Sequence, residues 1–268
     1  MSAALSLSVR AVALVGPGLA DWTAAQPVLT GAQPWVHAPT VLGAPQRLPP
    51  AERRRAGAAV KVALVVAEQV VQAGAVDPAT LASVYTSSNG DGANCHALCE
   101  ALAQPQRLVS PTRFTNSVHN APAGYWHIAV AGREASTSLC AHDGSFVAGL
   151  VEAIGLVRAR RQPILLVASD SPYPEPLQAA RPMADVVGVA LILSPEPADD
   201  DLARLAVELL PAGSVAEMPC HDVGLEGLRT QVPAARALPL LEAISRGQPA
   251  EVCLSWPAGP ALRIRVGT

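Results

Sequence analysis

The sequence predicts an α/β fold of three layers, in which a mainly parallel sheet of five strands lies between helices. Short apolar runs alternate along the chain with longer segments of helical periodicity, which is typical of strand–helix–strand units. The apolar runs are nearly continuous, as expected for strands that are buried on both faces. With 268 residues, half of them hydrophobic, the chain is long enough to bury a substantial core.

The N-terminal part begins with a predicted strand at Leu5–Gly16, where an alternating pattern becomes continuous. Residues 17–50 are rich in Pro and Gly and predict an irregular surface segment. A helix is expected at Pro50–Gly74, because proline opens it, Glu52 lies in its first turn and a glycine ends it. Ala and Val fill most of its positions, which indicates burial on most sides.

Strands and helices continue to alternate after this helix. Strands are expected at 83–87, 134–139, 163–170 and 184–195, and helices at 94–103, from 122 onward and at 144–161. Beyond residue 195 the pattern weakens: 199–210 fits a helix or a strand, 238–247 fits a helix, and 251–266 fits one or two closing strands. We therefore expect a domain at 1–195 and a short extension at 196–268 packed on it.

Charge and composition exclude several classes of function. The chain has 19 basic and 22 acidic residues, and its two dense basic runs, Arg53–Arg55 and Arg158–Arg161, lie at predicted helix ends, so no nucleic-acid partner is expected. No apolar stretch is long enough for a membrane span, and the N-terminus does not resemble a signal peptide. Five cysteines without disulfide-like spacing fit a reducing cytoplasm, so a cytoplasmic location is expected.

Neither a metal nor a cofactor is expected. Cys95 and Cys99 lie four residues apart with His96 between them, but a zinc site needs further ligands at matching spacing. We interpret these cysteines as small packing residues.

One segment, "STSLCAHDGSF" at 136–146, has the form of an active-site turn. A predicted strand ends just before Cys140, and a predicted helix follows. A helix N-terminus stabilises an anion and lowers the pKa of a nearby thiol, so Cys140 is a candidate nucleophile. The alternative is that Cys140 is a small packing residue.

These residues resemble the N-terminal half of the β-ketoacyl synthases, condensing enzymes of the thiolase superfamily. The run "NAPAGYWHIAVAG" leads to the strand before Cys140 as a helix does in that family, and "PILLVASDSP" and "VVGVALILSP" resemble later strands of the same half. The resemblance covers about residues 5–195. It implies a three-layer, thiolase-like half that lacks a full C-terminal half.

The alignment of this turn with the family's active-site motif decides which chemistry the resemblance implies. In the family, the catalytic cysteine lies three residues before one glycine and eight before another. Gly144 and Gly149 have this spacing from Ala141, so the nucleophile position holds a methyl group that cannot form an acyl thioester. The family's two catalytic histidines come from C-terminal motifs that this chain lacks; His221 has a different context.

The resemblance therefore implies a non-catalytic subunit related to the chain length factors that pair with active ketosynthases. It is closest to the shortened ketosynthase-like subunits of aryl polyene and xanthomonadin pathways, in polyketide or fatty acid-type biosynthesis. Such a subunit would form a heterodimer or heterotetramer with an active β-ketoacyl synthase, complete its acyl tunnel, and meet the acyl carrier protein through the complex.

The expected interface and tunnel residues come from the loop before the third predicted helix, that helix, the strand before the turn and the helix after it. They are Asn116, His119, Asn120, Tyr125, Ser136, Ser138 and Phe146. Capping for Asn116, His119 and Asn120, and core packing for Phe146 and Tyr125, are the structural alternatives. The alternative function is an acyltransferase or thioesterase in which Cys140 is the nucleophile with His142 or His119, and a third is a protein without an acyl role.

Overall fold

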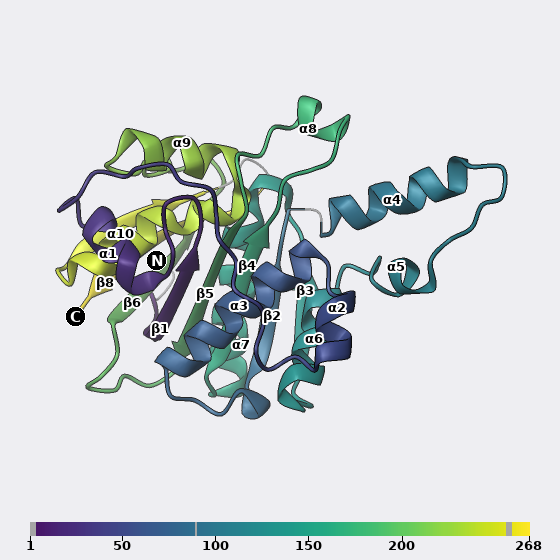
Figure 1. Ribbon diagram of the computed structural model, residues 1–268. Coiled ribbons are helices and arrows are strands. Elements are labelled where there is room, and N and C mark those ends of the chain that lie inside the picture. Colours follow the sequence, from purple (N-terminus) through teal and green to yellow (C-terminus); the bar gives the residue numbers. More distant parts are fainter. Residues whose placement is uncertain (1–3, 89, 256–258) are drawn as a thin grey trace.

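A single eight-stranded sheet forms the centre of the computed structural model, which describes residues 4–88, 90–255 and 259–268 (Figure 1). The strand order is β3-β2-β4-β5-β1-β6-β8-β7. In chain order the strands are β1 (Leu5–Val15), β2 (Ala82–Thr86), β3 (Ser136–Leu139), β4 (Ile164–Asp170), β5 (Val187–Ser194), β6 (Ala203–Leu210), β7 (Ala250–Leu254) and β8 (Ala261–Gly267).

The predicted α/β class is confirmed, and so is the five-stranded unit. β2 pairs in parallel with β3 and β4, while β5 runs antiparallel to both β4 and β1. Four of the five strands therefore point the same way. The sheet as a whole departs from the expected five strands, because β6, β8 and β7 extend it beyond β1 by antiparallel pairing.

The three added strands belong to the predicted extension. In β6, Leu205 and Val207 are buried while Arg204 is exposed, and this alternation marks a strand although Ala, Leu and Glu favour helices. The division at residue 195 stays a prediction. The strands on its two sides share one sheet, since β1 pairs with both β5 and β6.

Ten α-helices and three short 3₁₀ helices are present in the described residues. The α-helices are α1 (Trp22–Leu29), α2 (Pro50–Arg55), α3 (Ala58–Ala73), α4 (Gly92–Ala103), α5 (Pro111–Thr115), α6 (Ala121–Val130), α7 (Ser145–Arg160), α8 (Leu177–Ala180), α9 (Val223–Gln231) and α10 (Leu238–Arg246). The 3₁₀ helices are η1 (Pro78–Thr80), η2 (His142–Gly144) and η3 (Pro233–Ala237). None of the described helices combines the length and apolar character needed to cross a membrane.

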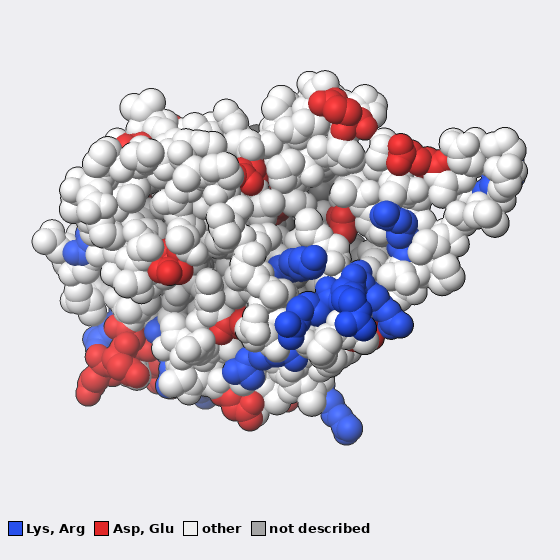
Figure 2. All heavy atoms as spheres, viewed as in Figure 1, with Lys and Arg blue, Asp and Glu red and all other residues white. Residues whose placement is uncertain are grey.

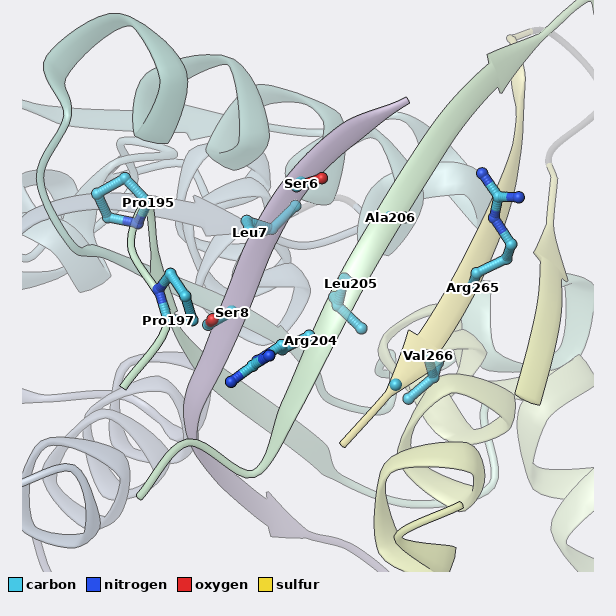
Figure 3. Close-up of a pocket in the computed structure, with 11 residues that line it drawn as sticks. Ser6, Leu7, Ser8, Pro195, Pro197, Arg204, Leu205, Ala206, Arg265 and Val266 are labelled. Atoms are coloured by element: carbon cyan, nitrogen blue, oxygen red, sulfur yellow. The ribbon is translucent and has the colours of Figure 1, made fainter. Parts of the chain in front are cut away.

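Helices cover both faces of the first five strands, which explains their continuous apolar sequences. Along β4, Leu165 and Val167 pack with α3 and α6, whereas Ile164 and Leu166 face the core shared with α7, α9 and α10. Figure 3 shows a hollow of about 320 Å³ on the part of the sheet formed by β1, β6 and β8. The exposed Arg204 of β6 lines this hollow, and none of the predicted site residues does.

Two predictions about residues 17–74 were wrong in detail. The segment expected to be irregular contains α1, whose N-terminus is capped by Asp21 Oδ1 accepting the Ala24 N–H at 2.8 Å. The single helix expected at Pro50–Gly74 is divided at Gly57. A Cβ at this glycine would lie 2.6 Å from Asp91 Oδ2, so a larger residue would displace the side chain that caps the N-terminus of α4.

The segment at residues 92–120, which contains α4 and α5, projects from the body of the molecule at the β3 side of the sheet (Figure 1). We call it the arm. Of the residues of α4, Asn94 alone is buried. The apolar side chains of Leu102, Leu108, Phe114 and Val118 are between 53% and 80% exposed. The arm therefore makes few core contacts of its own and presents apolar groups to solvent.

Gly149 offers a test of how α7 packs on the sheet. A Cβ at this position would lie 2.7 Å from Thr86 Cγ2 and 3.2 Å from Leu166 Cδ1. We expect Gly149→Ala to lower the free energy of unfolding, measured by urea denaturation, by about 1–3 kcal/mol through overpacking. Gly155→Ala is the matched control: no described atom lies within 4 Å of a Cβ there, and a gain of about 0.5–1 kcal/mol is expected. Equal effects at the two positions would contradict this packing.

Candidate functional site

The predicted turn connects β3, at one edge of the sheet, to α7. We call residues 140–144 the turn. Cys140 is exposed, Ala141 is half-buried, and His142 has a φ of 52°, an uncommon value for a residue other than glycine. Ala141, with its small side chain, therefore lies in a sharply bent strand-to-helix connection.

The buried hydroxyl of Ser145 holds the turn. Ser145 Oγ accepts a hydrogen bond from the Ala141 N–H at 3.0 Å, and it lies 2.7 Å from His142 O and 3.0 Å from Ser87 O, to either of which it can donate. Thr86 Oγ1 donates to Ser145 O at 2.8 Å. The Ala141 amide thus points at a side chain of the protein itself and is not free to stabilise an oxyanion.

No cysteine–histidine pair is assembled at the turn in the part of the chain that the structure describes. His142 Nδ1 lies 3.4 Å from Asp143 Oδ1, and His119 Nε2 lies 3.4 Å from Ser87 Oγ; neither ring is hydrogen-bonded to Cys140. The geometry provides an exposed thiol but not the base that would activate it.

Asp143 anchors the turn to two later segments of the chain. Its carboxylate lies 2.6 Å from an Arg181 guanidinium nitrogen and 3.9 Å from one of Arg236, in η3. Arg236 also binds Glu217 at 3.0 Å. Glu217 also forms an ion pair at 2.9 Å with Arg229, whose side chain is 7% exposed and which donates hydrogen bonds to Glu226. The hydrogen bond from Arg229 lowers the pKa of Glu226, so this carboxylate is charged at neutral pH.

Asp170 lies at the end of β4 and joins the N-terminal strands to η3. Oδ1 accepts the Ser88 N–H at 2.7 Å, and Oδ2 accepts the Ala234 N–H at 2.8 Å. The side chain is buried, and burial raises its pKa to about 6, although the hydrogen bonds from Ser88 and Ala234 oppose this rise.

The predicted polar residues of the arm and α6 have different surroundings. Asn116 is buried: its Nδ2 donates to Arg55 O at 2.8 Å, and its Oδ1 accepts from the Tyr125 hydroxyl at 3.0 Å. This pair ties the base of the arm to α2 and α6. Asn120 occupies the N-cap position of α6 without a side-chain capping bond, and it is exposed, as is His119.

The remaining predicted residues lie on β3 and α7. Ser136 accepts a hydrogen bond from the Ser83 hydroxyl at 3.1 Å across the β2–β3 pair. Ser138 Oγ is buried without a partner among the described residues. Phe146 is fully buried in the core between α7 and the sheet, and Tyr125 is 8% exposed in the core on the other face of the sheet. Both positions fit the alternative that these residues anchor the core.

Sequence reasoning did not identify Ser145, Asp170, Arg181 or Arg236. Their roles come from contacts between distant segments, and no local pattern marks them. The described residues contain no group of three or more His, Cys, Asp or Glu side chains arranged to hold a metal ion.

The raised pKa of Asp170 predicts a change of stability with pH. The folded state binds the Asp170 proton more tightly than the unfolded state does, so the free energy of unfolding falls as pH rises between about 4 and 6. The difference between a pKa of about 6 and one of 3.8 corresponds to about 3 kcal/mol. The difference in unfolding free energy between wild type and Asp170→Asn, measured by urea denaturation at each pH, should change by roughly this amount. If the unfolding free energies of the two proteins changed equally with pH, the raised pKa of Asp170 would be contradicted.

Comparison with known proteins agrees with the expected family. A family profile described as "Beta-ketoacyl synthase, N-terminal domain" matches residues 22–250, which is well over half of the chain. No curated protein sequence matches the chain.

Several solved structures share the fold. A chain of the ketosynthase (ApeO) in complex with its chain length factor (ApeC) from Xenorhabdus doucetiae is 23% identical with a TM-score of 0.72, and the match covers 98% of this chain and 100% of that one. A chain of the ishigamide ketosynthase/chain length factor is 15% identical with a TM-score of 0.71, covering 98% and 99%. A chain of AntDE:AntF, a type II polyketide synthase acyl carrier protein in complex with its ketosynthase, is 11% identical with a TM-score of 0.72 and full coverage of both.

At these identities the structural matches establish the fold, and the profile match establishes the relationship. Both confirm the resemblance that the turn and its glycine spacing indicated. The chain belongs to the β-ketoacyl synthase N-terminal domain family.

Proposed function

We propose that the chain is a non-catalytic, chain length factor-like subunit that pairs with an active β-ketoacyl synthase. The observation that carries the proposal is the hydrogen bond from the amide of Ala141 to Ser145, because the resemblance assigns Ala141 to the nucleophile position. A methyl group cannot attack a thioester, and the nearby histidines bind Asp143 and Ser87 instead of a cysteine. The similarity to chains from ketosynthase–chain length factor complexes supports a partner role.

The edge of the sheet at β3 supports an interface on this side of the molecule. β3 pairs with β2 along one side, and the structure describes no strand on its other side. An unpaired edge is a template for a strand of another chain. The arm lies beside this edge and exposes Phe114 and Val118, at 69% and 53%. Aromatic and apolar groups of this kind form the centres of stable interfaces.

We further propose that the arm completes the acyl tunnel of the ketosynthase in a heterodimer or heterotetramer. In this arrangement His119, Asn120 and Val118, at the end of the arm, would face the tunnel, and their bulk would limit the length of the chain. The pathway would be of the polyketide or fatty acid type, with aryl polyene or xanthomonadin pigments as products.

The acyl carrier protein would meet the subunit through this complex. Figure 2 shows basic side chains gathered over α2 and the start of the arm. Arg54, Arg55 and Arg113 line a hollow of about 450 Å³ there. Although the chain as a whole is slightly acidic, this local charge favours a partner with an acidic surface.

Variants of Cys140 test whether the subunit is catalytic. We expect the heterodimer formed on co-expression with the ketosynthase of the same genome to survive in Cys140→Ala and Cys140→Ser, and its elongation activity to remain within about twofold of wild type, because no reacting atom comes from this residue. Size exclusion and an elongation assay measure the two properties. Loss of activity in an intact complex, with an acyl adduct on Cys140 by mass spectrometry, would instead establish the acyltransferase or thioesterase alternative.

Phe114→Asp tests the interface. The side chain is mostly exposed in the isolated chain, so the unfolding free energy should change by less than about 0.5 kcal/mol. Burial of a carboxylate in the complex should weaken binding by about 2 kcal/mol or more, or roughly 30-fold in Kd, as measured by calorimetry. Val41→Asp, at a residue 83% exposed outside the arm, is the control and should leave Kd unchanged. Equal Kd values for Phe114→Asp and wild type would remove the arm from the interface.

Charge reversal tests the carrier-protein surface. Arg54→Glu should weaken binding of the carrier protein to the assembled complex by about 3- to 10-fold at low salt and by less at high salt, because the attraction is between exposed charges. Arg158→Glu, in the other basic run, is the control. If both variants bind the carrier protein as wild type does, the hollow at the base of the arm is not its docking surface.

A further inference from the structure

A small cavity lies at the carboxyl end of β2, between the N-terminal ends of α3 and α6. Its walls include Ser87, Gly90, Asn116, His119 and Ser169. Its volume, about 20 Å³ for the centre of a water-sized group, compares with roughly 10–15 Å³ needed for one water. The cavity therefore admits one such group and not a longer segment of a ligand.

Two polar side chains in the cavity have capacity for a ligand. Ser87 Oγ accepts the Gly90 N–H at 2.8 Å and lies 3.4 Å from His119 Nε2. This second distance exceeds the usual hydrogen-bond range of about 2.7–3.2 Å, so the contact is weak. Asn116, in contrast, already uses both ends of its amide. Ser87 and His119 therefore offer hydrogen-bonding capacity to a ligand, and the carboxylate of Asp91 and the hydroxyl of Ser169 also line the cavity.

The chemistry of the pair favours a hydroxyl group. Burial lowers the pKa of His119, so its ring is neutral at pH 7, with one nitrogen that accepts and one that donates. A hydroxyl between the two side chains can accept from the Ser87 hydroxyl and donate to His119 Nε2. A methyl group of similar size would separate the same two groups and leave them without that bridge, which costs free energy once a partner excludes water from the site.

We propose that this cavity receives the terminal hydroxyl of an acyl chain, so that Ser87 and His119 select chains with a hydrogen-bonding end over chains that end in a methyl group. The inference rests on the proposed function, since a chain reaches the cavity only if the end of the arm faces the tunnel of the ketosynthase. Val118, which lines the cavity and is itself exposed, lies between the cavity and that surface. The pair is specificity-determining and takes no part in bond formation.

The test uses the co-expressed complex and a series of paired starter thioesters of increasing length. Each pair has the same number of heavy atoms, as in ω-hydroxyoctanoyl and nonanoyl thioesters. At the length that reaches the cavity, wild type should elongate the hydroxyl-ended starter about two- to tenfold faster in direct competition, the range expected for one net hydrogen bond. His119→Leu, of similar volume, should bring this ratio to about one, and His119→Gln should restore part of it, because the amide oxygen accepts again.

The elongation rate with the methyl-ended starter, and the elution of the complex on size exclusion, report whether each variant still folds and assembles. A wild-type ratio near one at every length would overturn the proposal, and the cavity would then hold an ordered water only. A ratio that persists in His119→Leu with the complex intact would also overturn it. If no complex forms or elongates even in wild type, the proposed partner role fails first, and this inference fails with it.

Discussion

The hydroxyl group of Ser145 makes the contacts on which the geometry of the candidate site depends. It accepts the Ala141 N–H and lies within hydrogen-bond distance of Ser87 O and His142 O, while the Ser145 carbonyl accepts from Thr86. One buried residue thus fixes β2, the turn and the start of α7 relative to one another. None of these bonds uses the side chain at position 141, so a methyl group there leaves the turn intact. The position of Ser87, and with it the cavity beside His119, depends on the same contact.

The C-terminal residues support this site in three physical ways. Backbone pairing of β6 with β1 continues the sheet, and the charged cluster around Arg236 and Glu217 connects the turn to η3 and α9. The side chain of Arg229 is 7% exposed, and a buried guanidinium is tolerated only when carboxylates are close to it. Asp170 adds a third connection through its two backbone hydrogen bonds. The last part of the chain therefore does more than lengthen the sheet, because it also restrains the turn.

Local sequence patterns predicted the elements whose structure depends mainly on their own residues. The strands that are buried on both faces were located to within a few residues, since continuous apolar runs leave little choice of structure. α1 was missed because Pro27 lies inside it, and the break at Gly57 was missed although glycine weakens a helix. β6 was left undecided because its residues favour a helix, and pairing with β1 and β8 settles its structure.

The candidate site was likewise predicted in some respects and not in others. The resemblance assigned Ala141 to the nucleophile position from the spacing of Gly144 and Gly149, and that assignment stays a prediction. A Cβ at Gly149 would lie 2.7 Å from Thr86, which gives this glycine a packing reason. The ion pair of Asp143 with Arg181 joins residues 38 positions apart, which no local pattern records. The pairing of Asn116 with Tyr125 was likewise not predicted, although both residues were selected. Sequence reasoning therefore identified the region but not the bonds that hold it.

In the proposed function, the absence of a nucleophile and the presence of a partner surface would depend on different contacts of this chain. The turn is held by backbone groups and Ser145, the edge of β3 by its pairing with β2, and the base of the arm by Asn116. A partner that covers Phe114 and Val118 would also exclude water from the neighbouring His119. Hydrogen bonds strengthen where water is excluded, so the weak contact between Ser87 and His119 would discriminate between ligands more sharply in the complex than in the free chain. Selectivity for a polar chain end should therefore be a property of the assembled complex.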